Sequence, residues 1–173
     1  MIAIVGGTVV PVTKKTIREG TVLVKGNKIS SVGTSLKIPA RAMVLSAKGQ
    51  FVLPGLIDAH THLGIHEVGI REEGWDYNEI TEPVSAQLRA IDAINPLERG
   101  FQYARCGGVT TVGVAPGSAN PIGGAVTAIK TFGSVIDNMV IKNPVGIKAA
   151  LGENPKRVGR EFKRAPFTRM STA

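Results

Sequence analysis

Hydrophobic and polar positions alternate over the first fifty residues, and turn-forming residues interrupt the alternation at short intervals. The pattern predicts strands within three stretches: residues 2–7, 20–33 and 43–55. Gly26 and Asn27 tolerate positive φ and stand between two alternating runs, which predicts a β-hairpin. Lys48 and Gly49 predict a second turn of the same kind. Because no helical period occurs here, residues 1–53 are predicted to form a small β-sandwich subdomain.

The period of the pattern changes after residue 54. Residues 56–63 form a short apolar run that predicts a strand, and residues 64–82 are too polar for a core element, which predicts a loop. Residues 109–116 are rich in β-branched side chains and predict the next strand. A helix is predicted between these strands, and the order strand, loop, helix, strand favours parallel βα units.

The predicted helix has signals at both ends. Asn95 can cap it, Pro96 fits its first position, and Glu98 completes a capping box. Gly107 and Gly108 supply the stop. One face carries the apolar side chains that would pack on a sheet: Leu97, Phe101 and Ala104.

Three further segments complete the pattern. Residues 83–94 predict a short helix, and residues 125–133 fit either a helix or a strand. Residues 138–155 predict up to two strands, broken at Asn143–Pro144.

Composition limits the class of protein. With 43% hydrophobic residues and a mean hydropathy of +0.11, the 173-residue chain has enough apolar material for a packed core. No run approaches the roughly 18 apolar residues of a membrane span, and the first residues lack a basic segment and a cleavage site. A cytoplasmic location is therefore expected. The single cysteine, Cys106, excludes an intrachain disulfide and is expected to be a small buried hydrophobe.

The net charge of +8 is concentrated in the last part of the sequence. Residues 142–173 carry eight basic residues against two acids, whereas the preceding residues carry thirteen against eleven. Between His66 and Glu82 the bias reverses, with six acids against Arg71 alone. Both runs are typical of solvated faces, and no nucleic-acid motif accompanies the basic one. A nucleic-acid-binding module stays open as an alternative, but nucleic acid is not the expected partner.

Two histidines stand one residue apart at the end of the first strand after residue 54. His60 and His62 would project from the same face of that strand, with Asp58 two residues earlier. Two surface imidazoles are the ordinary outcome for an isolated pair of this kind. At the carboxyl end of a strand in a parallel α/β fold, however, the pair suits a divalent metal. Catalytic zinc commonly takes three protein ligands, so two imidazoles do not complete such a site.

Four stretches carry a resemblance to a known family: GQFVLPGLIDAHTHLG, EITEPVSAQLRAIDAINP, GGVTTVGVAPGSANPIGG and GIKAALGENPKRV. In this order they resemble the metal-dependent amidohydrolase superfamily and its imidazolonepropionase-like branch. The resemblance implies an α/β chain in which the small β-sandwich precedes the first half of a (β/α)8 metal-dependent hydrolase barrel over residues 54–173. It also implies that His60 and His62 are first-strand ligands of a divalent metal, with zinc expected.

The resemblance implies hydrolysis of carbon–nitrogen bonds in small non-peptide amides or cyclic amides through a metal-activated water. The family's barrel also uses histidines from its fifth and sixth strands and an aspartate from its eighth, and this sequence contains none of them. A full barrel needs about 250 residues, and about 120 follow the sandwich. We therefore expect the chain alone to be inactive and to associate with itself or with a missing carboxy-terminal half. A non-catalytic remnant or subunit is the alternative.

Two residues are candidates for completing the metal site. By resemblance to barrels that use a carboxylate or a carbamylated lysine from a middle strand, Glu153 is predicted as a metal ligand ahead of Lys148. The alternatives are a turn glutamate and a core-edge lysine whose head reaches water. His66 is expected to be a solvent-exposed loop residue. No residue is assigned as catalytic, and no organic cofactor is expected.

Two other features fit more than one role. Residues 117–124 could form a substrate-facing loop or a phosphate cradle, but their composition is also ordinary turn chemistry. Trp75 and Tyr77 could line a pocket, although packing onto the barrel rim is the commoner outcome.

Overall fold

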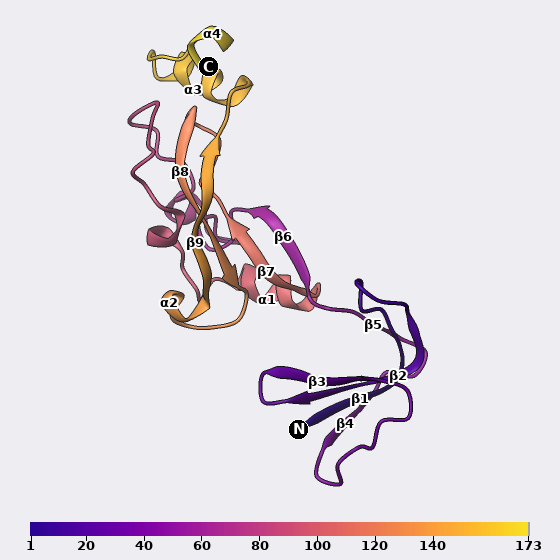
Figure 1. The fold of residues 1–173 in the computed structure, drawn as a ribbon. Coiled ribbons are helices and arrows are strands. Elements are labelled where there is room, and N and C mark those ends of the chain that lie inside the picture. Colours follow the sequence, from indigo (N-terminus) through magenta and orange to yellow (C-terminus); the bar gives the residue numbers. More distant parts are fainter. Residues whose placement is uncertain (173) are drawn as a thin grey trace. The chain divides into compact units, whose positions relative to one another are not determined.

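The computed structural model describes residues 1–172, and the chain divides into two compact units. One unit is Met1–Pro54, and the other begins at Gly55 (Figure 1). The change of sequence period after residue 54 coincides with this boundary, which lies one residue beyond the predicted end of the first subdomain.

Five strands make up the first unit: β1 (Ile2–Val9), β2 (Ile17–Lys25), β3 (Lys28–Gly33), β4 (Met43–Ser46) and β5 (Phe51–Val52). Their order is β3-β2-β1-β4, and β5 also pairs with β1. The predicted hairpin is confirmed, because β2 and β3 are antiparallel and Gly26 and Asn27 form the turn between them. Ala3 of β1 and Val22 of β2 are buried.

The predicted turn at Lys48–Gly49 is present, but the hairpin pairing across it is wrong. β4 and β5 do not pair with each other; both run parallel to β1, β4 beside Ile2–Val5 and β5 beside Thr8–Val9. The segment between β4 and β5 runs beside β1, where the Ala47 N–H donates to the Val5 carbonyl and the Thr8 N–H donates to the Gln50 carbonyl, both at 2.8 Å. It lies close to Gly7, at which an added Cβ would lie 2.8 Å from a methyl of Val52 and 2.9 Å from Ala47 Cβ.

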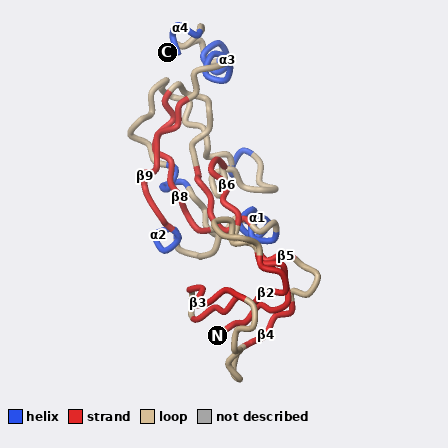
Figure 2. Tube along the Cα trace, turned by 45° about the vertical axis from the view of Figure 1, so that its right-hand side comes forward, coloured by secondary structure: helices blue, strands red, loops and turns tan. Residues whose placement is uncertain are grey.

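The second unit contains one four-stranded sheet, β6-β7-β8-β9, with short helices around it (Figure 2). The strands are β6 (Leu56–Thr61), β7 (Val109–Val114), β8 (Ile122–Lys130) and β9 (Val140–Ala149). The helices are α1 (Arg99–Cys106), α2 (Ile136–Met139), α3 (Glu153–Glu161) and α4 (Arg169–Thr172), with 3-10 turns η1 (Glu72–Gly74) and η2 (Ala90–Ala93). The α/β fold class is confirmed, and closure into a barrel stays a prediction.

Only one parallel βα unit is present among the described residues. β6 and β7 are parallel and are connected through α1, but β7 with β8 and β8 with β9 are antiparallel. A parallel crossover needs about a dozen residues or more, usually with a helix. The connections over residues 115–121 and 131–139 are shorter, so they make reversals. The prediction of successive parallel units was therefore wrong after β7.

β9 continues through Asn143–Pro144, where the sequence predicted a break. Within the described sheet β9 pairs with β8 alone, so proline's missing N–H removes no bond to a second neighbour. The β8–β9 register also shifts between Val126 and Ala128, opposite this segment. The ambiguous run over residues 125–133 is mostly strand β8, and residues 83–94 form only the turn η2 instead of the predicted helix.

The core of the second unit lies between the sheet and the helical segments. Its buried members come from the loop after β6, η2, α1, α2 and the two central strands: Ile65, Ala90, Ile94, Phe101, Val112, Val114, Ile129 and Met139. Phe101 occupies the predicted apolar face of α1, whereas Leu97 is 74% exposed because it precedes the helix. Val112 and Val114 bring β7, the parallel neighbour of β6, into this core.

The ends of α1 differ in part from the prediction. Glu98, rather than Asn95, caps the helix, since its side chain accepts a hydrogen bond from the Gly100 N–H. The helix stops at Gly107, as predicted. Cys106 is exposed, which corrects the buried assignment. Five residues after buried Phe101, it lies about 140° around the helix and so faces away from the core.

The sequence prediction did not include α3. Its first turn contains Glu153 and Pro155, both favourable near a helix N-terminus, and its last turn contains Arg160. Thr172 of α4 donates a hydrogen bond to the Leu151 carbonyl, which ties this end of the described chain to the segment after β9. Within residues 1–172, no helix combines the length and apolar character that crossing a membrane needs.

Candidate metal site

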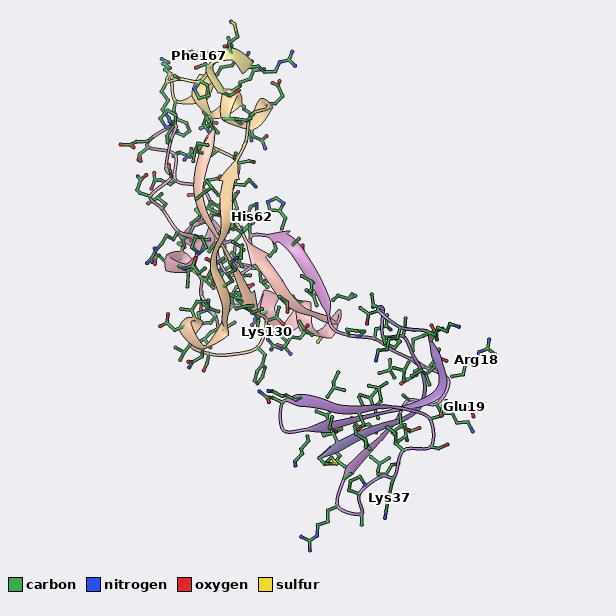
Figure 3. All side chains as sticks on the ribbon, in the orientation of Figure 1. Arg18, Glu19, Lys37, His62, Lys130 and Phe167 are labelled. Carbon is green, nitrogen blue, oxygen red and sulfur yellow. The ribbon has the colours of Figure 1, made fainter. Side chains whose placement is uncertain are left out.

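The carboxyl end of β6 carries His60 and His62. Their ring centroids lie 5.6 Å apart with an interplanar angle of 80°, and Figure 3 shows the labelled His62 side chain beside the sheet. Alternation along the strand explains their proximity. The Asp58 carboxylate accepts the His60 backbone N–H at 3.1 Å, a local bond within β6. The two predicted histidine ligands are therefore neighbours.

A backbone carbonyl anchors the His62 ring. Its Nδ1 lies 2.8 Å from the Ala115 carbonyl oxygen, just past the end of β7. The Ala115 N–H in turn donates to the Thr61 carbonyl at 2.9 Å, extending the β6–β7 ladder to the site. With Nδ1 donating its proton, Nε2 carries the lone pair that a metal would use.

The surroundings of His62 favour its neutral form. Burial lowers the pKa of His62, and the nearby charges of Lys148, His60 and His66 act in the same direction, against the Ala115 carbonyl. A metal binds the neutral imidazole, so the environment already selects the ligand form.

Lys148 of β9 reaches the same place. Its Nζ lies 2.7 Å from His60 Nε2. The close passage of β8 helps, because a Cβ added at Gly123 would lie only 3.4 Å from Lys148 Cγ. Burial lowers the pKa of Lys148. The lysine ranked second by sequence is therefore the residue that the structure brings to the histidines.

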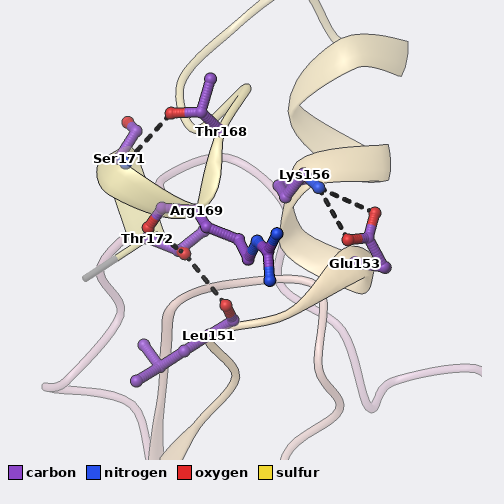
Figure 4. A network of polar contacts seen from close by, with 7 residues as sticks. All are labelled: Leu151, Glu153, Lys156, Thr168, Arg169, Ser171 and Thr172. Carbon is purple, nitrogen blue, oxygen red and sulfur yellow. Dashed lines mark hydrogen bonds and ion pairs between the residues drawn. The ribbon is translucent and has the colours of Figure 1, made fainter.

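Glu153 lies elsewhere in the second unit. Its exposed carboxylate pairs with Lys156 Nζ at 2.7 and 2.9 Å at the start of α3 (Figure 4). The Lys156 ammonium lowers the pKa of Glu153. Among residues 1–172 no group of three or more His, Cys, Asp or Glu side chains has a metal-holding arrangement. The structure thus does not bring Glu153 to His60 and His62, and its role as a ligand stays a prediction.

The loop after β6 places an aromatic side chain against His62 that sequence reasoning did not assign to the site. Tyr77 stacks on His62 at 5.4 Å between centroids and on exposed His66 at 4.8 Å. Trp75 meets the other side of His66 edge-on at 6.0 Å. Tyr77 follows His62 by fifteen positions through an irregular loop, so no period in the sequence signals the contact.

Residues 117–124 bind this loop rather than forming an open cradle. The Gly117 N–H donates to the Tyr77 carbonyl at 2.5 Å, and the Ala119 N–H donates to Asn78 Oδ1 at 3.1 Å. Asn120 Nδ2 donates to the Glu79 carbonyl and to Ser85 Oγ. Because these donors are engaged within the protein, residues 117–124 support the loop after β6 and are not free to bind a phosphate.

A cavity of about 240 Å³ adjoins Tyr77. Ile65, Leu88 and Pro116 supply apolar parts of its wall, while the rim carries acidic side chains, one of which, Asp92, is paired with Arg89 at 2.6 Å. Tyr77 therefore stands between this cavity and the imidazole of His62.

Comparison with known proteins gives the family. No protein-family model matches the chain. It is 32% identical over 165 residues to the amidohydrolase tasK of Hapsidospora irregularis, covering 87% of this chain and 17% of that protein. It is also 32% identical over 121 residues to an imidazolonepropionase of Alkaliphilus metalliredigens, covering 58% and 28%.

A solved structure agrees over nearly the whole chain. The crystal structure of an amidohydrolase from Thermotoga maritima superposes with a TM-score of 0.92 and 41% identity, covering 99% of this chain and 44% of that one. The chain thus spans less than half the length of each of these relatives. Over that length, the chain belongs to the amidohydrolase family.

Proposed function

We propose that this chain carries the first-strand metal site of a hydrolase that cleaves carbon–nitrogen bonds in small non-peptide amides or cyclic amides. The observation that carries the proposal is the anchoring of His62 Nδ1 on the Ala115 carbonyl, which leaves the lone pair of Nε2 available to a metal beside His60. Relatives named imidazolonepropionase and dihydroorotase support this class of reaction.

The two imidazoles fit two of the ligand positions of a divalent ion of the zinc type. Zinc binds neutral imidazole readily, and the second-nitrogen hydrogen bond seen at His62 is the usual partner of a metal-bound histidine. Zinc held by His60 and His62 would polarise a substrate carbonyl and lower the pKa of a bound water. The chain's own contribution is to hold both rings at the end of the sheet and to keep the proton of His62 on Nδ1.

Lys148 is the residue that we place next to the two ligands. An ammonium 2.7 Å from His60 Nε2 opposes a metal cation, so the lysine must lose its charge when the site is loaded. Burial already disfavours that charge and lowers the pKa. Carbamylation, in which the neutral amine bonds to carbon dioxide and releases a proton, would turn it into a carboxylate ligand. Glu153, which the sequence ranks ahead of Lys148, becomes the second candidate for this role.

Zinc titration of the 173-residue chain tests the site. We expect wild type to bind zinc, His60→Ala and His62→Ala to lose most of that affinity, and Lys142→Ala, at an exposed position of β9, to retain it as the control for Lys148. Lys148→Ala should weaken binding more than Glu153→Ala. With ¹³C-bicarbonate, a carbamate signal should be present in wild type and absent in Lys148→Ala. Equal zinc binding by wild type and both site variants would remove the assignment.

A further inference from the structure

Tyr77 stacks against two imidazoles. Its ring lies 5.4 Å from the His62 ring at an interplanar angle of 26°, and 4.8 Å from the His66 ring at 20°. The His66 N–H donates to the His62 carbonyl at 2.9 Å, so the same turn of chain brings both histidines to the tyrosine. Tyr77 therefore stacks on both histidines, and we call these three rings the stack.

The stack controls a motion that the anchoring hydrogen bond leaves free. The bond from Nδ1 to the Ala115 carbonyl fixes one point on the His62 ring, but the ring can still tilt about that bond. A flat surface against one face opposes the tilt, because stacked rings lose contact when their planes diverge. The tilt matters since it sweeps Nε2 across the place where a metal would sit.

The backbone fixes Tyr77 itself. The Gly117 N–H donates to the Tyr77 carbonyl, and a Cβ added at Gly117 would lie 2.7 Å from Tyr77 Cδ2. Glycine at this position therefore lets the loop press directly against the tyrosine ring. The neighbouring Asn78 side chain accepts the Ala119 N–H, which makes a second attachment.

We propose that Tyr77 is a positioning residue for the metal ligand His62: its ring sets the plane of the imidazole and so the direction of Nε2. The proposal rests on the proposed metal role of His62. In this proposal the aromatic face of Tyr77, and not its phenol hydroxyl, orients the His62 ring. Phenylalanine at this position should therefore orient it equally well.

Two variants of the full chain separate these roles. In Tyr77→Leu, zinc affinity measured by competition with a chromophoric chelator should fall about tenfold, the lower end for loss of an outer-shell partner. In Tyr77→Phe it should equal that of wild type. The His62 ring-proton resonances of the metal-free protein should carry the upfield ring-current shift in wild type and Tyr77→Phe, and lose it in Tyr77→Leu.

Trp75→Leu is the matched control, since this loop aromatic touches His66 and not His62. It should leave both the zinc affinity and the His62 resonances unchanged. If wild type binds zinc and Tyr77→Leu binds it equally well, the positioning role is overturned while the metal site stands. If wild type binds no zinc, both proposals fall. A loss shared by Tyr77→Phe would assign the effect to the hydroxyl and contradict the inference.

Discussion

Glu98 shows how a single buried carboxylate can organise the surroundings of the site. It is 6% exposed, and its Oε1 accepts the N–H groups of Gly100 at 2.6 Å and Val68 at 2.9 Å. The first bond caps α1, and the second attaches the loop that carries Tyr77 further along. One side chain thus joins the helix on the back of the sheet to the loop beside His62.

We predict that Glu98→Ala lowers the free energy of unfolding by about 1–2 kcal/mol, the usual cost of losing a helix cap. Amide hydrogen exchange should accelerate at Gly100 and Val68, because both N–H groups lose their acceptor. The exposed neighbour gives the control: Leu97→Ala should stay within about 0.5 kcal/mol of wild type. Unchanged exchange at both amides would contradict the role given to Glu98.

At the scale of elements, β1 depends on a glycine to accept two parallel partners. β4 and β5 pair with its two halves, and Gly7 lies between these two paired stretches, close to Ala47 of the connecting segment. The arrangement leaves no room for a side chain at this point, so the pairing should be sensitive to one added methyl group.

We predict that Gly7→Ala lowers the free energy of unfolding by about 1–3 kcal/mol through overpacking against Val52 and Ala47. Gly146→Ala provides the comparison, because a Cβ at Gly146 meets nothing within 4 Å. Urea denaturation of both variants measures the difference. A Gly7→Ala protein as stable as Gly146→Ala would show that β1 can shift to admit the methyl group.

The elements that the sequence predicts well are those decided locally. The hairpin at Gly26–Asn27, strand β6, the loop after it and strand β7 follow from period and turn chemistry over a few residues. The direction of β8 and the partner of β5 depend on residues far away in sequence, so no local pattern contains them. Pro144 predicted a break by a local rule, but β9 lies at the edge of the described sheet, where that rule does not apply.

The residues of the candidate site also fall into those that local sequence predicts and those that depend on distant residues. Alternation within one strand is enough to pair His60 with His62. Lys148 lies near the histidines because of the register of β9 with β8. Tyr77 lies there because its irregular loop is hydrogen-bonded to Gly117. The sequence favours Glu153 as a metal ligand because a carboxylate can coordinate a metal. In the structure its charge is instead paired with Lys156, one helical turn away.

At the scale of the whole molecule, the second unit leaves both outer strands of its sheet open. Among the described strands, β6 pairs only with β7 and β9 only with β8. Apolar side chains on these strands are exposed, with Ile57 at 73% and Ile147 at 53%. Unpaired edges and exposed apolar side chains favour association with another polypeptide.

We predict that the chain self-associates in a concentration-dependent way. Size-exclusion chromatography with light scattering should give a mass above that of one chain, and Ile57→Lys with Ile147→Lys should shift it toward the monomer. Lys28→Arg, on β3 of the other unit, is a neutral control that should leave the mass distribution unchanged. A sharp monomer peak at all concentrations would show that the open edges are tolerated as they are.

The bond between His62 and Ala115 has a consequence for how the sequence can vary. The acceptor is a main-chain oxygen, so the hydrogen bond does not require any particular side chain at 115. The side chain there is limited only by space, because Ala115 is 2% exposed. The number of residues between β7 and this carbonyl is restricted more strongly. Successive carbonyls along an extended chain point in opposite directions, so one residue gained or lost after β7 would present an N–H where the imidazole needs an oxygen. Position 115 can therefore tolerate substitution by another small residue far better than an insertion or deletion beside it.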